Sequence, residues 1–175
     1  MSDKPVLLMI VERFPPDIGG VARSSFRTAV ALTHLGWDVH VLAWTKSLSP
    51  GVLESSHPEQ YPPFQEGADS GSYADMNRLT LHRLGLFSNM DLSMQHTSNV
   101  LEWLHKSTGY AATWGHYVYP AGYMAVVFAE TAGIPSTVSA RGNDIDRLMF
   151  PPGDFARLMW TLQRTTTVSC VSKEL

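Results

Sequence analysis

Residues 6–35 read VLLMIVERFPPDIGGVARSSFRTAVALTHL. The first six residues are apolar without interruption, which is typical of a parallel strand buried on both faces. Pro15 and Pro16 then break regular structure, and Gly19-Gly20 stands directly before a segment with helical periodicity. A strand, a glycine turn and a helix N-terminus in this order favour anion binding, because free amides and the helix dipole face the space above the strand. A tight connection without a ligand explains the glycine pair equally well, and both interpretations stay open.

The standard nucleotide-binding signatures are missing. No G-x-G-x-x-G follows the first strand, and no G-x-x-x-x-G-K-[ST] occurs in the chain. An ordinary NAD or ATP site is therefore not expected. A nucleophile elbow, G-x-S-x-G, is also absent, which removes the simplest hydrolase hypothesis.

The composition is that of one globular domain. The chain has 175 residues, of which 44% are hydrophobic and 17% are charged. A net charge of −3 gives no basic footprint for nucleic acid. Cys170 is the only cysteine, which excludes an internal disulfide, and we expect a buried, inert thiol. No apolar run approaches the roughly 20 residues of a membrane span. These features favour a cytoplasmic location and leave open a peripheral contact at the inner face of the membrane.

Strands and helices alternate along the chain. The predicted strands are 6–11, 39–44, 79–84, 111–114, 136–140 and 167–171. The predicted helices follow Gly20, a cap at Ser88, Pro120 and Gly153. Residues 45–77, rich in Ser, Pro and Gly, predict a long loop or insertion, with a flexible excursion favoured over an ordered lid. The alternation predicts an α/β fold: a Rossmann-like, doubly wound, mainly parallel sheet with helices on both faces.

Three polar clusters follow predicted strands, at residues 13–20, 115–117 and 141–146. Ligands of open α/β sheets bind at the carboxyl ends of the strands, so these clusters should share one edge. The seven histidines show no metal-ligand spacing, and no metal site or cofactor is expected.

The candidate residues in these clusters each have a second interpretation. Asp17 could bind sugar hydroxyls or simply hold its turn. His116 could contact a ligand or serve as a structural histidine. Arg141 could pair with a phosphate, or form an ion pair with Asp144 or Asp146.

The chain resembles glycosyltransferase family 4 in three ordered segments. Residues 14–44, FPPDIGGVARSSFRTAVALTHLGWDVHVLAW, are similar to the opening strand, glycine loop and helix of that family. Residues 115–146, GHYVYPAGYMAVVFAETAGIPSTVSARGNDID, resemble its "H … G-I-P … H-G-x-D" region, and residues 165–175, TTTVSCVSKEL, resemble its "V-x-x-V-S" strand.

This resemblance implies the GT-B architecture, in which two Rossmann-like domains face each other and catalysis requires no metal. The N-terminal domain of such enzymes holds the acceptor, and its glycine loop, matched here by Gly19 and Gly20, meets the donor diphosphate. Residues 141–144 match H-G-x-D, with Arg141 in place of the usual histidine. We expect Arg141 and Asp144 to be catalytic, and the following residues to bind substrate: Asp17, Gly19, Gly20, His116 and Asn143.

The resulting hypothesis is that residues 1–175 form the N-terminal, acceptor-side domain of a retaining glycosyltransferase. Its partners would be a nucleotide-diphosphate sugar, an acceptor and a C-terminal donor-binding domain that is absent from this chain. The fragment by itself is expected to be inactive. The alternatives are a free-standing phosphate- or sugar-binding module and a sugar-nucleotide epimerase of similar architecture.

Overall fold

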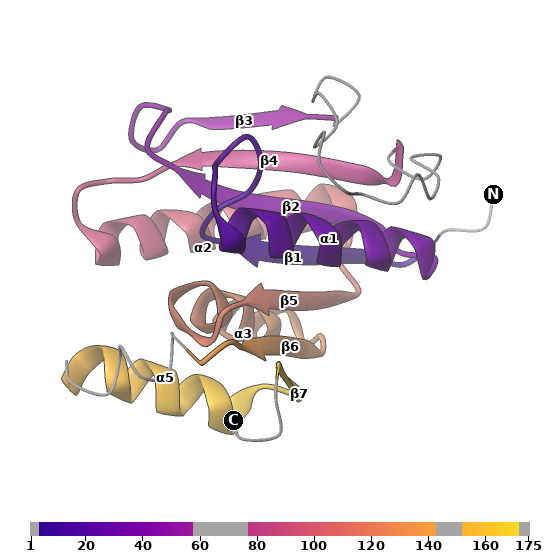
Figure 1. Ribbon diagram of the computed structural model, residues 1–175. Coiled ribbons are helices and arrows are strands. Elements are labelled where there is room, and N and C mark those ends of the chain that lie inside the picture. Colours follow the sequence, from indigo (N-terminus) through magenta and orange to yellow (C-terminus); the bar gives the residue numbers. More distant parts are fainter. Residues whose placement is uncertain (1–3, 58–76, 143–151, 172–175) are drawn as a thin grey trace.

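The structure is a computed structural model, and it describes residues 4–57, 77–142 and 152–171 (Figure 1). Within these ranges seven strands form one sheet, in the spatial order β3-β4-β2-β1-β5-β6-β7. The strands are β1 (Val6–Val11), β2 (Asp38–Thr45), β3 (Leu53–Ser56), β4 (Leu79–Gly85), β5 (Ala112–His116), β6 (Ser136–Ala140) and β7 (Thr167–Cys170). β1 lies at the centre, as its uninterrupted apolar sequence predicts.

The sheet is wound in two halves. From β1 the chain builds β2 and β4 on one side, and it then crosses to the other side of β1 to build β5, β6 and β7. Neighbouring strands run parallel, except for the antiparallel pair β3 and β4. The point where the strand order reverses therefore lies between β1 and β5. The predicted α/β, Rossmann-like, mainly parallel fold is confirmed.

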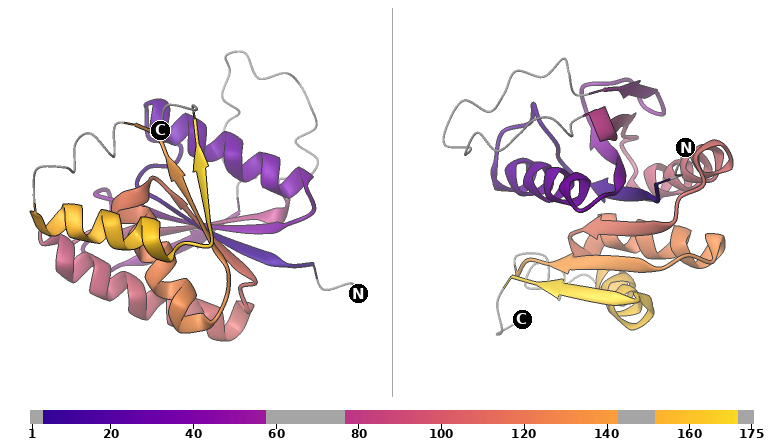
Figure 2. Two further views of the ribbon diagram at one scale, coloured as in Figure 1. Left: turned by 90° about the horizontal axis from the view of Figure 1, so that it is seen from below. Right: turned by 90° about the vertical axis from the view of Figure 1, so that its right-hand side faces the viewer.

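Helices cover both faces of the sheet (Figure 2). They are α1 (Gly20–His34), α2 (Met90–Thr108), the short π-helical segment η3 (Val118–Gly122), α3 (Tyr123–Ala132) and α5 (Pro152–Arg164). Because side chains alternate along a strand, Leu7 and Met9 of β1 share a core with α1, whereas Leu8 and Ile10 share the opposite core with α2, α3 and α5.

The beginning of α2 differs from the sequence prediction. We expected Ser88 to cap this helix, but the cap is Asn89, whose Oδ1 accepts hydrogen bonds from the amides of Asp91 (2.8 Å) and Leu92 (3.3 Å). The two positions are adjacent, and both Ser and Asn suit a helix N-terminus, so the sequence pattern alone could not separate them. The expected end of α2 at Gly109 is confirmed, since Gly109 adopts the left-handed conformation with φ 68°.

The predicted loop at residues 45–77 contains a strand. Residues 53–56 form β3, which pairs with β4 at the edge of the sheet. β3 is short and only partly buried, so its sequence carries no apolar alternation. Its place is fixed by backbone pairing and by the Ser55 hydroxyl, which lies 2.7 Å from Nδ1 of His82 on β4. The rest of the predicted loop, residues 58–76, lies outside the described residues.

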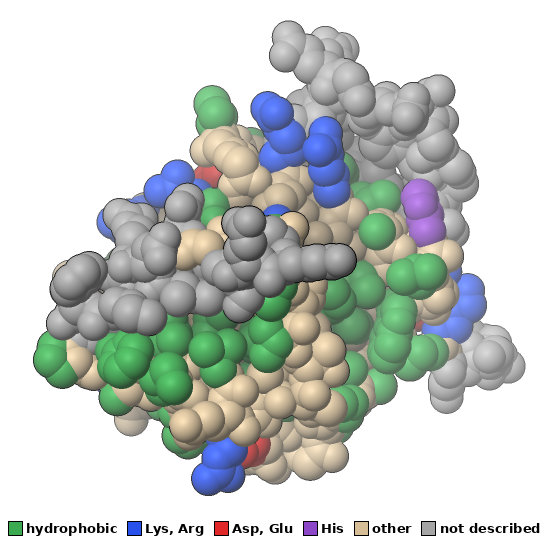
Figure 3. All heavy atoms as spheres, turned by 60° about the horizontal axis from the view of Figure 1, so that its bottom comes forward, with side chains coloured by type: hydrophobic (Ala, Val, Ile, Leu, Met, Phe, Trp, Pro, Cys, Tyr) green, Lys and Arg blue, Asp and Glu red, His purple; other side chains and the backbone are tan. Residues whose placement is uncertain are grey.

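The other edge of the sheet is exposed. Cys170 of β7 is accessible to solvent, so the expectation of a buried thiol is wrong. β7 is the outermost strand and most of its residues are exposed, which the apolar character of the segment did not indicate. Figure 3 shows hydrophobic side chains gathered on the face that carries α5, and exposed hydrophobic residues include Met159 of α5 and Val168 of β7. No helix among the described residues has the length and apolar character to cross a membrane.

Candidate functional site

The candidate site lies at the carboxyl edge of the sheet, where the strand order reverses. β1 and β5 are neighbours there, and Val11 at the end of β1 pairs with His116 at the end of β5. The loop 12–19 leaves β1 at this edge and leads into α1. Two of the predicted polar clusters are thus brought together by the pairing of two strands that are far apart in the sequence.

The glycine loop leaves open space above the N-terminus of α1. Gly19 is the N-cap residue and has φ 135°, a conformation that L side chains rarely adopt. Gly20 is the first residue of α1, and its φ lies outside this left-handed range. A Cβ atom built on either glycine would meet no atom within 4 Å. The helix N-terminus has no acidic residue in its first turn, so an anion could approach its amides closely.

The loop that leads to these glycines is held in place at several points. The Asp17 amide donates a hydrogen bond to the Phe14 carbonyl (3.1 Å), which closes a turn. The guanidinium of Arg83 on β4 donates to the Pro15 carbonyl. The Ser25 hydroxyl, on α1, donates to the Arg13 carbonyl (2.9 Å). The backbone of the loop is therefore anchored to both the sheet and α1.

His116 links β5 to α1. Its Nε2 atom lies 2.9 Å from the hydroxyl oxygen of Ser24, and that hydroxyl donates its proton to the Val21 carbonyl (3.1 Å). Nε2–H of His116 is then the donor to Ser24, and Nδ1 carries the lone pair. Nδ1 is buried and has no hydrogen-bond partner among the residues that the structure describes. A buried acceptor of this kind is costly unless a further group supplies a donor.

Burial sets the charge of His116. The side chain is fully buried, and desolvation, assisted by the positive charge of Arg141, lowers the pKa of His116 to about 4. The imidazole is therefore neutral near pH 7 and acts through hydrogen bonds rather than by holding a charge. Arg141 directly follows β6, in which Ser139 pairs with His116, so the two residues lie at the same edge of the sheet.

The backbone around His116 is tightly constrained. Tyr117 has φ 96°, which is uncommon for a residue with a side chain and which turns the chain sharply after β5. A Cβ atom on Gly115 would collide with the backbone of Gly122, in η3, and a Cβ atom on Gly122 would collide with the Tyr117 carbonyl. The absence of side chains at these two glycines allows η3 to lie directly against the end of β5.

A pocket of about 450 Å³ opens beside the glycine loop. Its walls come from the segments that follow β1, β2 and β4, from the start of α2 and from η3. The lining residues are Glu12, Arg13, Asp17, Ile18, Trp44, Thr45, Lys46, Leu86, Met90 and Pro120. This volume is within the range of about 300–1,000 Å³ that is typical of small-molecule sites.

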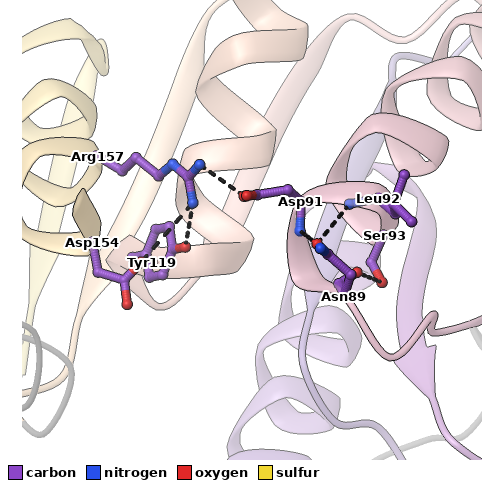
Figure 4. Close-up of polar contacts among 7 residues, drawn as sticks. All are labelled: Asn89, Asp91, Leu92, Ser93, Tyr119, Asp154 and Arg157. Atoms are coloured by element: carbon purple, nitrogen blue, oxygen red, sulfur yellow. Dashed lines mark hydrogen bonds and ion pairs between the residues drawn. The ribbon is translucent and has the colours of Figure 1, made fainter. Parts of the chain in front are cut away.

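A polar cluster connects α5 with α2 and η3, the two helical segments that contribute residues to this pocket (Figure 4). Arg157 of α5 donates to the carboxylate of Asp91 at the start of α2 (2.8 Å) and to the hydroxyl of Tyr119 in η3 (3.1 Å). Met90 and Pro120, which line the pocket, directly adjoin these two partners in the sequence. Arg157 therefore helps to set the spacing between α2 and η3.

The structure brings together most of the predicted site residues that it describes. Asp17 lines the pocket, Gly19 and Gly20 form the N-terminus of α1, and His116 and Arg141 lie at the ends of adjacent strands. Asn143 and Asp144 lie outside the described residues, as does Asp146. No group of three His, Cys, Asp or Glu side chains suited to a metal ion occurs in the described ranges.

Sequence reasoning missed three residues of the site. Ser24 is the partner of His116, and Arg13 and Lys46 line the pocket. The signal for Arg13 and Lys46 was available, since each closely follows a predicted strand. Ser24 lies about one helical turn after Gly20, but nothing in the sequence indicates that its hydroxyl faces a histidine.

Solved structures share this fold. Sucrose-phosphate synthase from Thermosynechococcus elongatus superposes with a TM-score of 0.60 at 11% identity, covering 94% of this chain and 42% of that protein. UDP-GlcNAc 2-epimerase from Methanocaldococcus jannaschii gives a TM-score of 0.59 at 10% identity, covering 96% of this chain and 40% of that protein. The chain thus spans about two fifths of the length of either structure, and at these identities the likeness extends to the fold alone.

Sequence comparison identifies the family. No curated protein sequence matches the chain. A family model described as "Glycosyl transferase 4-like domain" does match it, over residues 19–175, which is nearly the whole chain and includes α1, His116 and the segment after β6. This chain belongs to the family of glycosyl transferase 4-like domains.

Proposed function

We propose that this domain is the acceptor-side half of a retaining glycosyltransferase that moves a sugar from a nucleotide-diphosphate donor to an acceptor. Membership in the family supports the transferase activity. In this proposal a C-terminal domain of the same protein carries most of the donor site, and the two domains face each other across the carboxyl edge described above. The enzyme acts in the cytoplasm and requires no metal.

The glycine loop contributes to catalysis by stabilising the leaving diphosphate. Free amides at the N-terminus of α1 and the positive end of the helix dipole face the open space above Gly19 and Gly20. Negative charge grows on the diphosphate as the glycosidic bond breaks, so donors that are already in position lower the barrier. Arg141 adds a positive charge near the same edge.

His116 contributes a neutral hydrogen-bonding group. Because burial lowers its pKa to about 4, it does not gain or lose a proton near pH 7. Its unpaired Nδ1 atom is instead suited to accept a hydrogen bond from a substrate hydroxyl once the substrate and the remaining chain close over the site. Asp144 and Asn143, in the segment after Arg141, complete the proposed site.

The observation that carries this proposal is the convergence of the glycine loop, His116 and the pocket at the switch point of the sheet. The test is a transfer assay on the full-length protein with a panel of UDP, GDP and ADP sugars. We expect transfer with at least one donor, retention of the anomeric configuration by NMR, and activity that survives a metal chelator.

Two variants sharpen this assay. Arg141→Gln should reduce transfer strongly, whereas Arg27→Gln, which changes an exposed arginine on α1, should leave it unchanged.

A full-length protein that binds sugar phosphates but transfers nothing would instead identify a binding module. Epimerisation of the nucleotide sugar without an acceptor would identify an epimerase.

A further inference from the structure

Arg157 on α5 contacts two walls of the pocket, although it is not among the described residues that line it. Its guanidinium donates to the carboxylate of Asp91 (2.8 Å) and to the hydroxyl of Tyr119 (3.1 Å). Asp91 directly follows Met90, which lines the pocket from α2. Tyr119 directly precedes Pro120, which lines the pocket from η3. One side chain of a third element therefore joins these two walls.

The guanidinium of Arg157 is itself held in place. Asp154, one turn earlier on α5, lies 3.9 Å from the same nitrogen that contacts Tyr119. The guanidinium carbon also lies 5.9 Å from the ring centroid of Tyr123 on α3. Figure 4 shows the guanidinium between Asp91 and Tyr119. A planar group with several donors suits such a bridge, because it can serve two acceptors at once without rotating.

The two partners of Arg157 differ in how their own elements hold them. The amide of Asp91 donates to the capping residue Asn89 (2.8 Å), and a carboxylate in the first turn of α2 is favoured by the helix dipole. Tyr119 instead has an extended backbone (φ −144°, ψ 141°) inside η3, so regular helical hydrogen bonding does not define its position. Arg157 therefore ties an irregular wall of the pocket to a well-fixed one.

We propose that Arg157 is a positioning residue for acceptor binding: it sets the width of the pocket between Met90 and Pro120. It does not touch the acceptor and acts through Asp91 and Tyr119. This inference rests on the proposed function, because it takes the pocket to receive the acceptor. Loss of Arg157 should weaken acceptor binding and leave the chemical step, which belongs to the glycine loop and the strand ends, nearly unchanged.

The first test separates KM from kcat in the full-length enzyme. It uses the panel of sugar donors with glucose, glucose-6-phosphate and inositol as acceptor probes, and it is run on each pair that gives transfer. Arg157→Gln should raise the KM for the acceptor about tenfold, the factor expected from the loss of hydrogen bonds made by a charged group. It should change kcat less than about twofold. A purely structural role would lower the melting temperature and leave the KM of the folded enzyme unchanged.

The matched control is Arg164→Gln. Arg164 also lies on α5, also pairs with a carboxylate, that of Glu130 on α3 (3.3 Å), and also lies over an aromatic ring, that of Trp160 (6.0 Å). None of these three residues lines the pocket. The acceptor KM of Arg164→Gln should therefore equal that of the unaltered enzyme.

A double variant assigns the effect to the bridge. Asp91→Asn should raise the acceptor KM, and it should add little in the Arg157→Gln background, because both changes break the same contact. Additive effects would show that the two residues act separately, which would contradict the proposed bridge.

The second test needs no activity. Amide hydrogen exchange in residues 88–93 and 117–122 should be faster in Arg157→Gln than in Arg164→Gln, since only the first variant releases the two walls. Equal exchange in both segments would overturn the inference, and so would equal acceptor KM values in the two variants.

The two tests also separate this inference from the proposed function. A protein that transfers no sugar to any acceptor contradicts the proposed function, and hydrogen exchange then decides the role of Arg157 alone. Faster exchange at both walls in Arg157→Gln would keep Arg157 as the residue that sets the width of the pocket.

Discussion

The hydroxyl oxygen of Ser24 lies 2.9 Å from Nε2 of His116, although the two residues are 92 positions apart in the sequence. Ser24 belongs to α1, which begins at the glycine loop, and His116 is the last residue of β5. This contact links α1, whose N-terminus would meet a donor phosphate in the proposed function, to the carboxyl end of β5. Because the Ser24 hydroxyl donates to the Val21 carbonyl, the proton of His116 is assigned to Nε2.

Replacing Ser24 tests this contact. Ser24→Ala would leave the buried Nε2–H of His116 without its acceptor, which should lower the free energy of unfolding by about 1–3 kcal/mol. Denaturant unfolding measures the loss. The control is Ser107→Ala on α2, since Ser107 likewise donates to a carbonyl three residues earlier, with no histidine involved in that contact. Equal effects of the two variants would show that the Ser24–His116 contact contributes nothing.

Replacing Gly20 tests the glycine loop. The structure leaves open space at Gly20 and does not place it at positive φ, so Gly20→Val should cost less than about 1 kcal/mol of stability. If a diphosphate approaches here, the new side chain blocks it, and transfer by the folded full-length enzyme should fall by about a hundredfold to a thousandfold.

The measurement combines a thermal melt with a transfer assay on the same sample. Gly153→Val is the matched control, because Gly153 also lies in the first turn of a helix, α5, and also has open space around it. Normal turnover per folded molecule of Gly20→Val would mean that the glycine pair is only a tight connection.

Replacing Gly115 tests the close contact between β5 and η3. Gly115→Ala would push a methyl group against the backbone of Gly122, which cannot move aside like a flexible side chain. Overpacking of this kind should lower the free energy of unfolding by about 1–3 kcal/mol. Gly153→Ala, at an open helical position, should be neutral or slightly stabilising. A neutral Gly115→Ala would contradict the close approach.

Stability should fall with acid over a defined pH range. Burial lowers the pKa of His82 and of His116 to about 4, and it lowers the pKa of His40 as well. As the pH falls, these histidines take up protons first in the unfolded chain, where the pKa of a histidine is about 6.5. In the folded protein they take up protons only at a lower pH. The stability that these neutral histidines contribute is therefore fully present above that pH and decreases as the pH falls towards 4, by about 1.4 kcal/mol per pH unit for each of His82 and His116, and His40 changes stability in the same direction.

Denaturant unfolding between pH 7 and 4 measures this slope. The two ring nitrogens of His82 contact the Ser55 hydroxyl on β3 (2.7 Å) and Nδ1 of His40 on β2 (3.1 Å). Neither partner is a carboxylate that would stabilise the protonated form of His82. His82→Gln should remove about one histidine's share of the slope, whereas His34→Gln, at an exposed position on α1, should not. A slope that His82→Gln leaves unchanged would contradict the assignment.

Much of the fold could be read from local patterns. The apolar run 6–11 predicts β1 with its observed bounds, and Ser136–Ala140 is also predicted to the residue. Each of these strands is mostly buried, so its apolar composition indicates a position inside the sheet. β3 was missed because an edge strand needs no apolar alternation, and Cys170 was wrongly expected to be buried because composition does not reveal which strand ends the sheet.

The candidate site was only partly accessible from the sequence. Asp17, Gly19, Gly20 and His116 could be proposed from their positions after strands, since carboxyl ends of parallel strands share one edge. Arg13 and Lys46 closely follow predicted strands, so their place at this edge was accessible from the sequence, whereas nothing in the sequence indicates that the Ser24 hydroxyl faces a histidine. The role of such a side chain depends on which residues of other elements it faces in the folded protein.

The sequence by itself determined the alternation of strands and helices, the glycine turn before α1 and the family to which the chain belongs. These depend on short-range properties: apolar periodicity, backbone conformation at Gly and Pro, and motif order. Only the tertiary structure decided the order of strands around β1, the Ser24–His116 contact and the lining of the pocket. The physical reason is that these contacts join segments far apart in the chain, whose distances are set by sheet pairing and helix packing rather than by any local pattern.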